Sequence, residues 1–233
     1  MDGLLLVNKK TGISSYDVIR KIKRVFKSSD KYAEIRHPKI GHAGTLDPFA
    51  SGLLIVLVGK ATKKMMSIHE YSKVYDVTAE FGYETDTQDL TGKIIAKDQK
   101  KAALDKGDIL AVMQGMLGKQ LQVPPNYSAK KVKGRRAYSL AREGKELNLA
   151  PKEIEVFQFE LTDFSWPKIS FRLEVSTGTY IRTIVSDLAK RIGRCATAVE
   201  LRRVSIGPYI VEDAINVDSI LTLKDVESNI IKI

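Results

Sequence analysis

Segments with helical and with strand-like apolar spacing are interspersed along this chain, without the regular spacing of βαβ units. Amphipathic helices are predicted where apolar residues recur every three or four positions, in segments 18–26, 109–117 and 181–192. Strands are predicted where residues alternate or form short apolar runs, in segments 3–7, 53–58, 74–81 and 168–175. This order predicts an α+β fold with a central, mainly antiparallel mixed sheet flanked by helices and loops.

The length and the apolar content are those of a chain with a substantial core. With 233 residues, of which 43% are hydrophobic, one sizeable domain is possible, and a fibrous or disordered chain is excluded. No internal repeat, low-complexity tract or Gly/Ser-rich linker divides the sequence, so residues 1–233 are predicted to form a single domain. The residues from Val211 onward are expected to form a small helical cap.

The charge is strongly basic. Lys and Arg number 38 against 28 Asp and Glu, a net charge of +10. Such a surplus favours polyanionic partners, although a merely basic surface remains an alternative. The polar side of the first predicted helix is itself basic, and we interpret it as a solvated face: Arg20, Lys21, Lys23, Arg24 and Lys27.

Cysteine and histidine are scarce. The single Cys195 excludes an internal disulfide and a Cys-rich zinc or iron–sulfur site, and the three histidines are scattered, so no metal site is expected. The N-terminal apolar run 3–7 is too short for a signal peptide, and no run is long enough to span a bilayer. A cytoplasmic location without membrane association is therefore expected.

Helical and strand periodicity both disappear between residues 29 and 51, which predicts a long loop. It contains Gly41-His42-Ala43-Gly44-Thr45-Leu46-Asp47-Pro48, directly before the predicted buried strand 53–58. A loop of this kind can present Asp47 to a cleft while its glycines allow close approach of another backbone. An Asp that only bonds nearby amides in a turn is the alternative that the pattern leaves open.

This octapeptide, followed by Ser51-Gly52-Leu53-Leu54, resembles the signature loop of the TruB family of tRNA pseudouridine synthases. Further segments match the family in order along nearly the whole chain: Gly3 to Ser15, Lys73-Val74-Tyr75, Gln122 to Lys130 and Gly178-Thr179-Tyr180-Ile181-Arg182. The resemblance implies a pseudouridine synthase fold and an isomerase that converts uridine 55 in the T arm of tRNA.

The same resemblance assigns roles to individual residues. It implies that Asp47 is the nucleophile, that Arg182 holds the carboxylate ionised, and that Tyr75 supports a flipped base. A buried carboxylate needs such a cation, because burial alone favours its neutral form. His42 is implied to insert near the flipped nucleotide, and Tyr180 and Leu201 to wall the pocket. Neither a cofactor nor a metal is required for this chemistry.

Residues 124–152 resemble the family's RNA-binding insertion, called here the thumb. Five basic side chains there are expected to bind tRNA: Lys130, Lys133, Arg135, Arg136 and Arg142. A solvated basic tract is the alternative. Since the chain ends at Ile233, little room is expected for the C-terminal PUA-type domain of many relatives, and the protein is expected to act as a monomer.

Two other functions are compatible with the same pattern. One is a non-catalytic RNA-binding or RNA-folding protein on this scaffold, which basic charge alone supports equally well. The other is the catalytic subunit of a guide-RNA-directed pseudouridine synthase, whose core is similar. The presence of Asp47, Tyr75 and Arg182 argues against the first, and inactivity on naked tRNA is what the second predicts.

Overall fold

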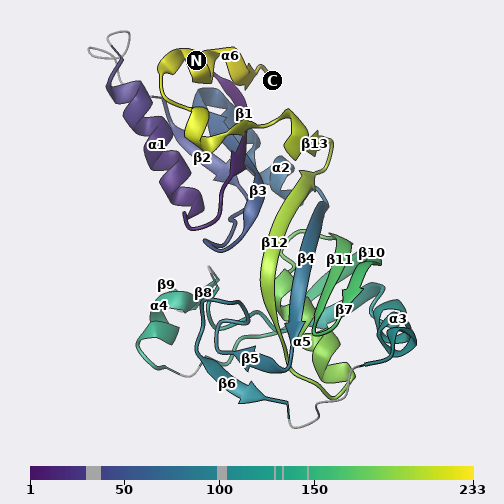
Figure 1. Ribbon diagram of the computed structural model, residues 1–233. Helices are drawn as coiled ribbons and strands as arrows, with labels where there is room; N and C mark the ends of the chain where they lie inside the picture. The colour runs from purple at the N-terminus through teal and green to yellow at the C-terminus, as the bar shows by residue number, and fades with distance from the viewer. Residues whose placement is uncertain (30–37, 99–103, 129, 133, 146) are drawn as a thin grey trace. The chain divides into compact units, whose positions relative to one another are not determined.

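The structure is a computed structural model, and it describes residues 1–29, 38–98, 104–128, 130–132, 134–145 and 147–233. The chain forms two compact units (Figure 1). The first unit comprises residues 1–75 and 201–233, and the second comprises residues 76–200. Two strands, β4 (Lys73–Phe81) and β12 (Ala196–Ile206), contribute residues to both units.

The first unit is built on a sheet in the order β14-β1-β3-β12. Its long strands β1 (Gly3–Lys9) and β3 (Ser51–Val58) are antiparallel, whereas β12 runs parallel to β3 and β14 (Ile215–Asn216) parallel to β1. Three short strands are added by antiparallel pairing: β2 (Ile40–Ala43) on β3, β13 (Tyr209–Ile210) on β12 and β15 (Ile230–Ile231) on β1.

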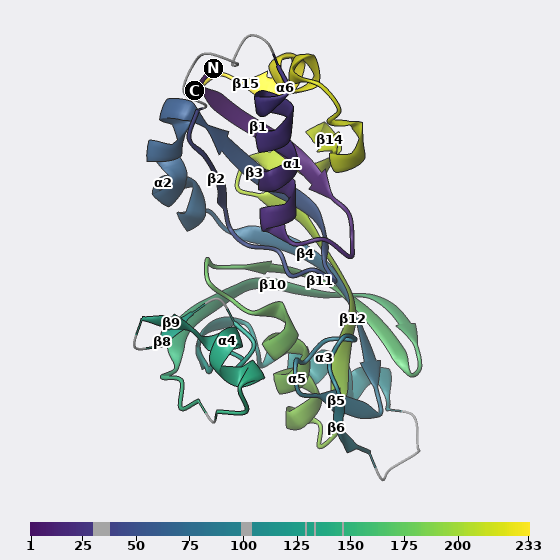
Figure 2. The same cartoon turned by 90° about the vertical axis from the view of Figure 1, so that its left-hand side faces the viewer.

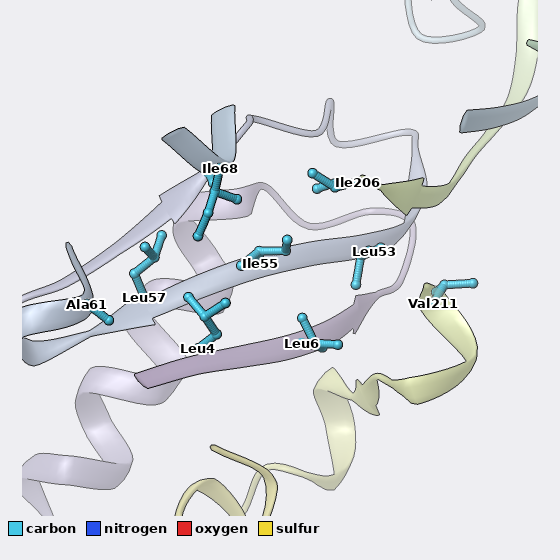
Figure 3. Packing of buried hydrophobic residues seen from close by; sticks show 10 residues of the cluster. Leu4, Leu6, Leu53, Ile55, Leu57, Ala61, Ile68, Ile206 and Val211 are labelled. Carbon is cyan, nitrogen blue, oxygen red and sulfur yellow. The ribbon is translucent and has the colours of Figure 1, made fainter. Parts of the chain in front are cut away.

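One face of this sheet carries a cluster of buried aliphatic side chains (Figure 3). Antiparallel register places Leu4 opposite Leu57 and Leu6 opposite Ile55, so these side chains lie on the same face. Ile68 from α2 (Met65–Glu70) packs on this cluster, and the 3-10 turn η2 (Gly59–Lys64) precedes that helix. Because the alternate residues of β1 and β3 are also fully buried, both faces of the sheet are covered.

Helix α1 (Ser15–Lys27) packs in the first unit beside β1 and β2 (Figure 2). Ser14 caps its first turn, since the Ser14 hydroxyl accepts a hydrogen bond from the Asp17 amide and the Asp17 carboxylate accepts one from the Ser14 amide. The apolar side is buried, and the basic side faces outward. After β13 the chain forms turns η3 (Val211–Asp213) and η4 (Val217–Ser219) and then α6 (Leu223–Asn229).

The second unit contains the sheet order β12-β4-β11-β10-β7. Its strands β7 (Gly118–Gln122), β10 (Lys152–Ser165) and β11 (Lys168–Val175) are joined by antiparallel pairs. Helix α3 (Lys106–Gln114) contacts both β10 and α5 (Ile181–Arg191). Two small hairpins complete the unit: β5 (Tyr83–Thr85) with β6 (Ile94–Lys97), and β8 (Lys131–Val132) with β9 (Arg135–Arg136), the latter followed by α4 (Ala137–Arg142).

The predicted α+β class and the mixed, mainly antiparallel sheet are confirmed. Every predicted helix and strand is present, although the second helix begins at Lys106 and ends at Gln114, earlier than its apolar spacing indicated. The predicted loop 29–51 contains β2, and the predicted helical cap also contains β14 and β15. These short strands carry too few residues for a periodic signal, and pairing with β1 and β3 defines them. No described helix is long and apolar enough to cross a membrane.

Candidate active site

The loop between β2 and β3 carries Asp47, and hydrogen bonds hold its backbone on both sides of this residue. Before Asp47, the hydroxyl of Ser15 accepts a hydrogen bond from the Leu46 amide (2.8 Å) and donates one to the Leu46 carbonyl (3.1 Å). After it, the Pro48 carbonyl accepts a hydrogen bond from the Gly12 amide (2.8 Å). Asp47 itself is half-buried. The position of its carboxylate is thus supported by the first turn of α1 and by the turn after β1.

Lys9 is a fully buried cation beneath this loop. Its Nζ donates hydrogen bonds to the carbonyls of Ala50 (2.6 Å), Ile13 (2.8 Å) and Lys10 (2.9 Å). Burial lowers the pKa of Lys9 from 10.5 to about 8, against the opposing attraction of the Asp47 carboxylate. Lys9 therefore ties the end of the loop to the turn after β1 and places a positive charge near Asp47.

Arg203 is a second buried cation, with 1% of its surface exposed. Its Nε donates to the Leu53 carbonyl (2.8 Å) and its Nη2 to the Gly44 carbonyl (3.0 Å), so it bridges the two ends of the loop. The backbone of Arg203 lies against Gly52, where an added Cβ would fall 2.2 Å from the Arg203 carbonyl oxygen. Glycine is required at position 52 by this contact and by its φ of +103°.

The sequence analysis assigned no role to Lys9 or Arg203. A lysine at the end of an otherwise apolar strand was the available signal for Lys9, because an isolated charge in a buried strand needs polar partners. Arg203 lies in β12, a strand that was not predicted, and its partners are carbonyl groups remote in sequence. Nothing in the local pattern distinguished it from a surface arginine.

His42 lies in β2, opposite Val56 of β3. Burial lowers the pKa of His42 below 6.5, and the nearby positive charge of Arg203 lowers it further. The imidazole is therefore neutral at pH 7. Its Nδ1 atom is buried and has no hydrogen-bond partner among the described residues, which is uncommon for a buried polar atom.

Tyr75 and Leu201 lie in the two strands that leave and re-enter the first unit. Tyr75 on β4 and Leu201 on β12 are both buried, with 7% of the residue surface exposed in each. Burial on β4 alternates as predicted, and Lys73, on the same face as Tyr75, donates from Nζ to the carbonyls of Tyr71 (2.6 Å) and His69 (2.8 Å). The first unit thus contains Asp47, His42, Tyr75 and Leu201.

Arg182 lies in the first turn of α5 in the second unit and is 3% exposed. Its guanidinium donates to the carbonyls of Thr87 (2.5 Å) and Tyr127 (3.0 Å), and its Nη1 lies 3.5 Å from the Asp89 carboxylate. The hydroxyl of Thr91 in turn donates to Asp89 (2.6 Å). The guanidinium is therefore held in a fixed orientation, and Asp89 is a site residue that the sequence analysis did not identify.

Tyr180 is the residue that precedes α5. Its amide donates to the Gln122 side-chain oxygen (2.8 Å), and its carbonyl accepts from the Gln122 side-chain nitrogen (3.1 Å). Gln122 is buried at the end of β7, immediately before the thumb. Its side-chain amide therefore links the first turn of α5 to the base of the thumb.

The thumb is a hairpin and a short helix whose basic side chains are largely exposed. The guanidinium of Arg135 pairs with the Glu143 carboxylate, which also lies 2.9 Å from Nζ of Lys145. Hydrogen bonds from these two cations lower the pKa of Glu143 to about 2. Arg142 lies over the ring of Tyr138, 5.7 Å from its centroid.

Of the other predicted thumb residues, Lys130 donates from Nζ to the Ala150 carbonyl (3.0 Å), which joins the beginning and the end of the thumb. Arg136 is exposed in β9. Lys133 lies outside the described residues. The second unit therefore carries Arg182, Tyr180 and the described part of the thumb.

The predicted pairing of Asp47 with Arg182 joins residues of different units, and it stays a prediction. The backbone next to Asp47 and the guanidinium of Arg182 are each held by hydrogen bonds inside their own unit. No group of three or more His, Cys, Asp or Glu side chains in the described ranges is arranged to hold a metal ion.

Residues 30–181 match the model of the TruB family pseudouridylate synthase N-terminal domain. A tRNA pseudouridine synthase B from Opitutus terrae is 40% identical over 235 residues, which cover 100% of this chain and 93% of the relative. A tRNA pseudouridine synthase B from Caldicellulosiruptor saccharolyticus is 37% identical over 98% of this chain and 77% of its own length.

Solved structures share the same fold. A chain of a Cbf5–Nop10–Gar1 complex is 25% identical with a TM-score of 0.68, and a chain of an archaeal box H/ACA Nop10–Cbf5 complex is 22% identical with a TM-score of 0.65. This chain spans about half of each, 54% and 51%, while 93% of its own length is covered. The predicted pseudouridine synthase fold is thereby confirmed. The chain belongs to the TruB family of pseudouridylate synthases.

Proposed function

We propose that this isomerase converts uridine to pseudouridine in tRNA, at position 55 of the T arm, with Asp47 as its nucleophile. Both units act as one catalytic domain, residues 1–233, and the protein acts as a cytoplasmic monomer. The observation that carries the proposal is a half-buried Asp47 on a loop held by Ser15, Lys9 and Arg203, in a chain 40% identical to a tRNA pseudouridine synthase B.

The reaction breaks the C–N bond between uracil and ribose, turns the freed base and joins the same sugar carbon to C5 of uracil. The proton on C5 is lost and N1 gains one, so no atom is added and no electron is transferred overall. A carboxylate attacks the sugar carbon, stabilises its positive charge or helps to remove a sugar proton. The uracil anion is delocalised and leaves without a second carboxylic acid of the kind that glycosidases use.

Asp47 suits this role because its backbone is fixed and a buried cation lies near it. The positive charge of Lys9 attracts the Asp47 carboxylate, as the opposing effect on the pKa of Lys9 indicates. A nucleophile held by the fold requires little reorganisation when substrate arrives. Arg182, oriented by Asp89 and two carbonyl groups, is proposed to complete the site as the cation that faces Asp47.

The uridine must leave its stack to reach a carboxylate in a folded domain. Tyr75 supplies the aromatic surface against which the flipped base stacks, and its phenol relays the proton from C5. His42 is neutral at pH 7 and has an unpartnered Nδ1, so it suits hydrogen bonding to an uncharged group of the RNA. Tyr180 and Leu201 form walls of the pocket, and the thumb cations Lys130, Lys133, Arg135, Arg136 and Arg142 bind the phosphate backbone.

The decisive experiment compares Asp47→Asn with wild type on unmodified tRNA, with pseudouridine mapped at nucleotide resolution. Wild type is expected to modify position 55, and the variant is expected to bind the same RNA within about threefold while forming no product. Asp213→Asn is the matched control, because Asp213 is an exposed aspartate of the same unit outside the site, and it should retain wild-type rates. Product formation by Asp47→Asn would rule out the nucleophile assignment.

The same assay separates the two alternatives. A non-catalytic RNA-binding protein predicts that wild type binds tRNA without forming product. A guide-directed subunit predicts activity only when a guide RNA and partner proteins are added. The higher identity to a tRNA pseudouridine synthase B than to the chain from the Cbf5–Nop10–Gar1 complex, 40% against 25%, favours activity on naked tRNA.

A further inference from the structure

Helix α1 carries a row of exposed side chains that the catalytic site does not use. Tyr16, Arg20, Lys23 and Lys27 follow one another at steps of three or four residues, so they share one side of the helix, and we call them the α1 stripe. All four are exposed. From the first to the last member the helix rises about 16 Å, a length that accommodates several phosphates of one nucleic-acid strand.

The first part of the α1 stripe is organised around an exposed aromatic ring. Tyr16 has 58% of its surface exposed. The guanidinium of Arg20 lies 5.7 Å from the ring centroid and Nζ of Lys23 lies 5.9 Å from it. Because a cation over an aromatic face is attracted to it, Tyr16 holds these two positive groups on the same side of the helix.

The last part of the α1 stripe borders a groove of about 650 Å³ between α1, β2, η2 and α2. Its floor and walls are partly apolar, with Phe26, Ile40 and Met65, and its charged residues are Lys23, Lys27 and Lys39. None of the described residues that line it is acidic. A groove of this size, whose described lining carries three cations, is complementary to a negatively charged partner.

The positive charges of these three lysines differ from those of Arg20 and Lys21 in their described contacts. Arg20 pairs with Asp17, and Lys21 donates to the Asp218 carbonyl (3.2 Å). In contrast, Lys23, Lys27 and Lys39 form no ion pair with a carboxylate in the described part of the chain. Phosphate contact with release of counterions is the interaction that such lysines favour.

The α1 stripe and the groove both adjoin the segment of the first unit that carries Asp47, the loop between β2 and β3, which we call the catalytic loop. The stripe begins next to Ser15, whose hydroxyl holds Leu46 directly before Asp47. The groove contains Gly41, the first residue of the octapeptide that ends at Pro48. An RNA strand that leaves Asp47 along α1, the helix that Figure 2 shows in the first unit, would therefore pass Arg20, Lys23 and Lys27.

We propose that the α1 stripe and the groove with Lys39 bind the sugar–phosphate backbone of a second segment of the same RNA whose uridine reacts at Asp47. This inference rests on the proposed function, and it replaces the solvated-face interpretation of the α1 cations. RNA is the occupant that fits a row of cations about 10 Å long, on a helix that begins beside a loop proposed to act on RNA.

The test measures tRNA affinity at several salt concentrations for the triple variant Lys23→Ala, Lys27→Ala, Lys39→Ala. The matched control is Lys168→Ala, Lys224→Ala, Lys232→Ala, which removes three exposed lysines outside the groove. The groove variant is expected to bind at least tenfold more weakly, with a log–log salt slope smaller in magnitude by about two to three. Its single-turnover rate at saturating tRNA should equal that of wild type, because these lysines do not touch the reacting uridine.

Two results overturn this inference. One is unchanged binding by the groove variant, and the other is an equal change in both triple variants, which reports net charge alone. Far-UV circular dichroism and thermal unfolding establish that each variant is folded. A wild-type protein that neither binds nor modifies tRNA contradicts the proposed function itself, whereas active wild type with an unaffected groove variant contradicts only the role of the groove.

Discussion

The catalytic loop and the thumb both depend on positive charge, and they use it in opposite ways. Beneath the loop, Lys9 and Arg203 are 0% and 1% exposed and donate to backbone carbonyls that determine where Asp47 lies. In the thumb, Arg135 and Arg142 are exposed, and their described contacts are with the surface side chains Glu143 and Tyr138. The first arrangement fixes geometry, and the second presents charge.

This difference agrees with what each region is proposed to bind. A nucleophile must meet one sugar carbon within a fraction of an ångström, so order that is built into the fold lowers the barrier. A phosphate backbone offers many equivalent oxygens, and exposed cations find them without a single fixed geometry. Substitutions in the loop should therefore change stability and rate, whereas substitutions in the thumb should change affinity and its salt dependence.

Gly52→Ala is expected to have the largest effect. The new Cβ would lie 2.2 Å from the Arg203 carbonyl oxygen at a φ of +103°, so β3 and β12 must separate locally. We expect a loss of about 4 kcal/mol in the free energy of unfolding, measured by urea denaturation. Gly82→Ala is the matched control, since Gly82 has a φ of +110° and open space around its Cβ position. Equal losses in the two variants would show that backbone strain alone, and not the close approach of Arg203, requires glycine at position 52.

Lys9→Met is expected to have the second largest effect. It keeps an unbranched side chain, one atom shorter, and removes the donor for three carbonyls, so we expect a loss of about 3 kcal/mol in the free energy of unfolding and a lower turnover rate. Lys10→Met is the control, because the Lys10 side chain is 54% exposed and pairs with Asp218 at the surface. A Lys9→Met protein as stable and active as this control would show that the loop does not depend on its buried cation.

The pH dependence gives an independent measure of Lys9. Its pKa is about 8 in the folded protein and 10.5 in the unfolded chain, so between these values the unfolded chain binds more protons. The contribution of Lys9 to stability therefore rises with pH between about 8 and 10.5. The stability difference between wild type and Lys9→Met should widen over that range, as measured by denaturation at pH 7.5 and pH 10. A difference that is constant or narrows contradicts the lowered pKa.

The fold could be predicted from the sequence where apolar periodicity is strong. The alternation in β4 and β11, the run in β3 and the amphipathic spacing in α1 and α5 all identify their elements correctly. Strands β10 and β12 were not predicted, because charged residues interrupt their apolar positions. Pairing with neighbouring strands determines them, and a local window contains no information on such partners.

The residues of the candidate site also divide into those that the sequence predicted and those that it did not. Asp47 and Arg182 were singled out through motifs that are contiguous in sequence, and hydrogen bonds hold the backbone next to Asp47 and the guanidinium of Arg182. Lys9, Asp89 and Arg203 were missed because their partners are carbonyls or side chains brought together only by folding. Recognition of a motif therefore finds the groups proposed to react, whereas the groups that hold them require coordinates.

In the thumb, the double variant Arg135→Ala, Arg136→Ala is expected to weaken tRNA binding about tenfold. The salt slope should fall in magnitude by about one for each phosphate that the variant no longer binds, as measured by binding at several salt concentrations. The double variant Lys97→Ala, Lys168→Ala removes two exposed lysines of the same unit outside the thumb and serves as control. An unchanged slope in the thumb variant would mean that the thumb is a solvated basic tract that does not bind phosphate.

Glu143→Gln should have the smallest effect on tRNA affinity, and it should raise the affinity where the other thumb variant lowers it. The Glu143 carboxylate pairs with Arg135 and Lys145, and its pKa of about 2 keeps it charged throughout the neutral range. The substitution removes a negative charge that competes with phosphate for both cations, so we expect tRNA to bind two- to threefold more tightly, equally at pH 5 and pH 8. Weaker binding would mean that Glu143 positions Arg135 for its phosphate. The thumb would then resemble the catalytic loop, with geometry and not merely charge built into it.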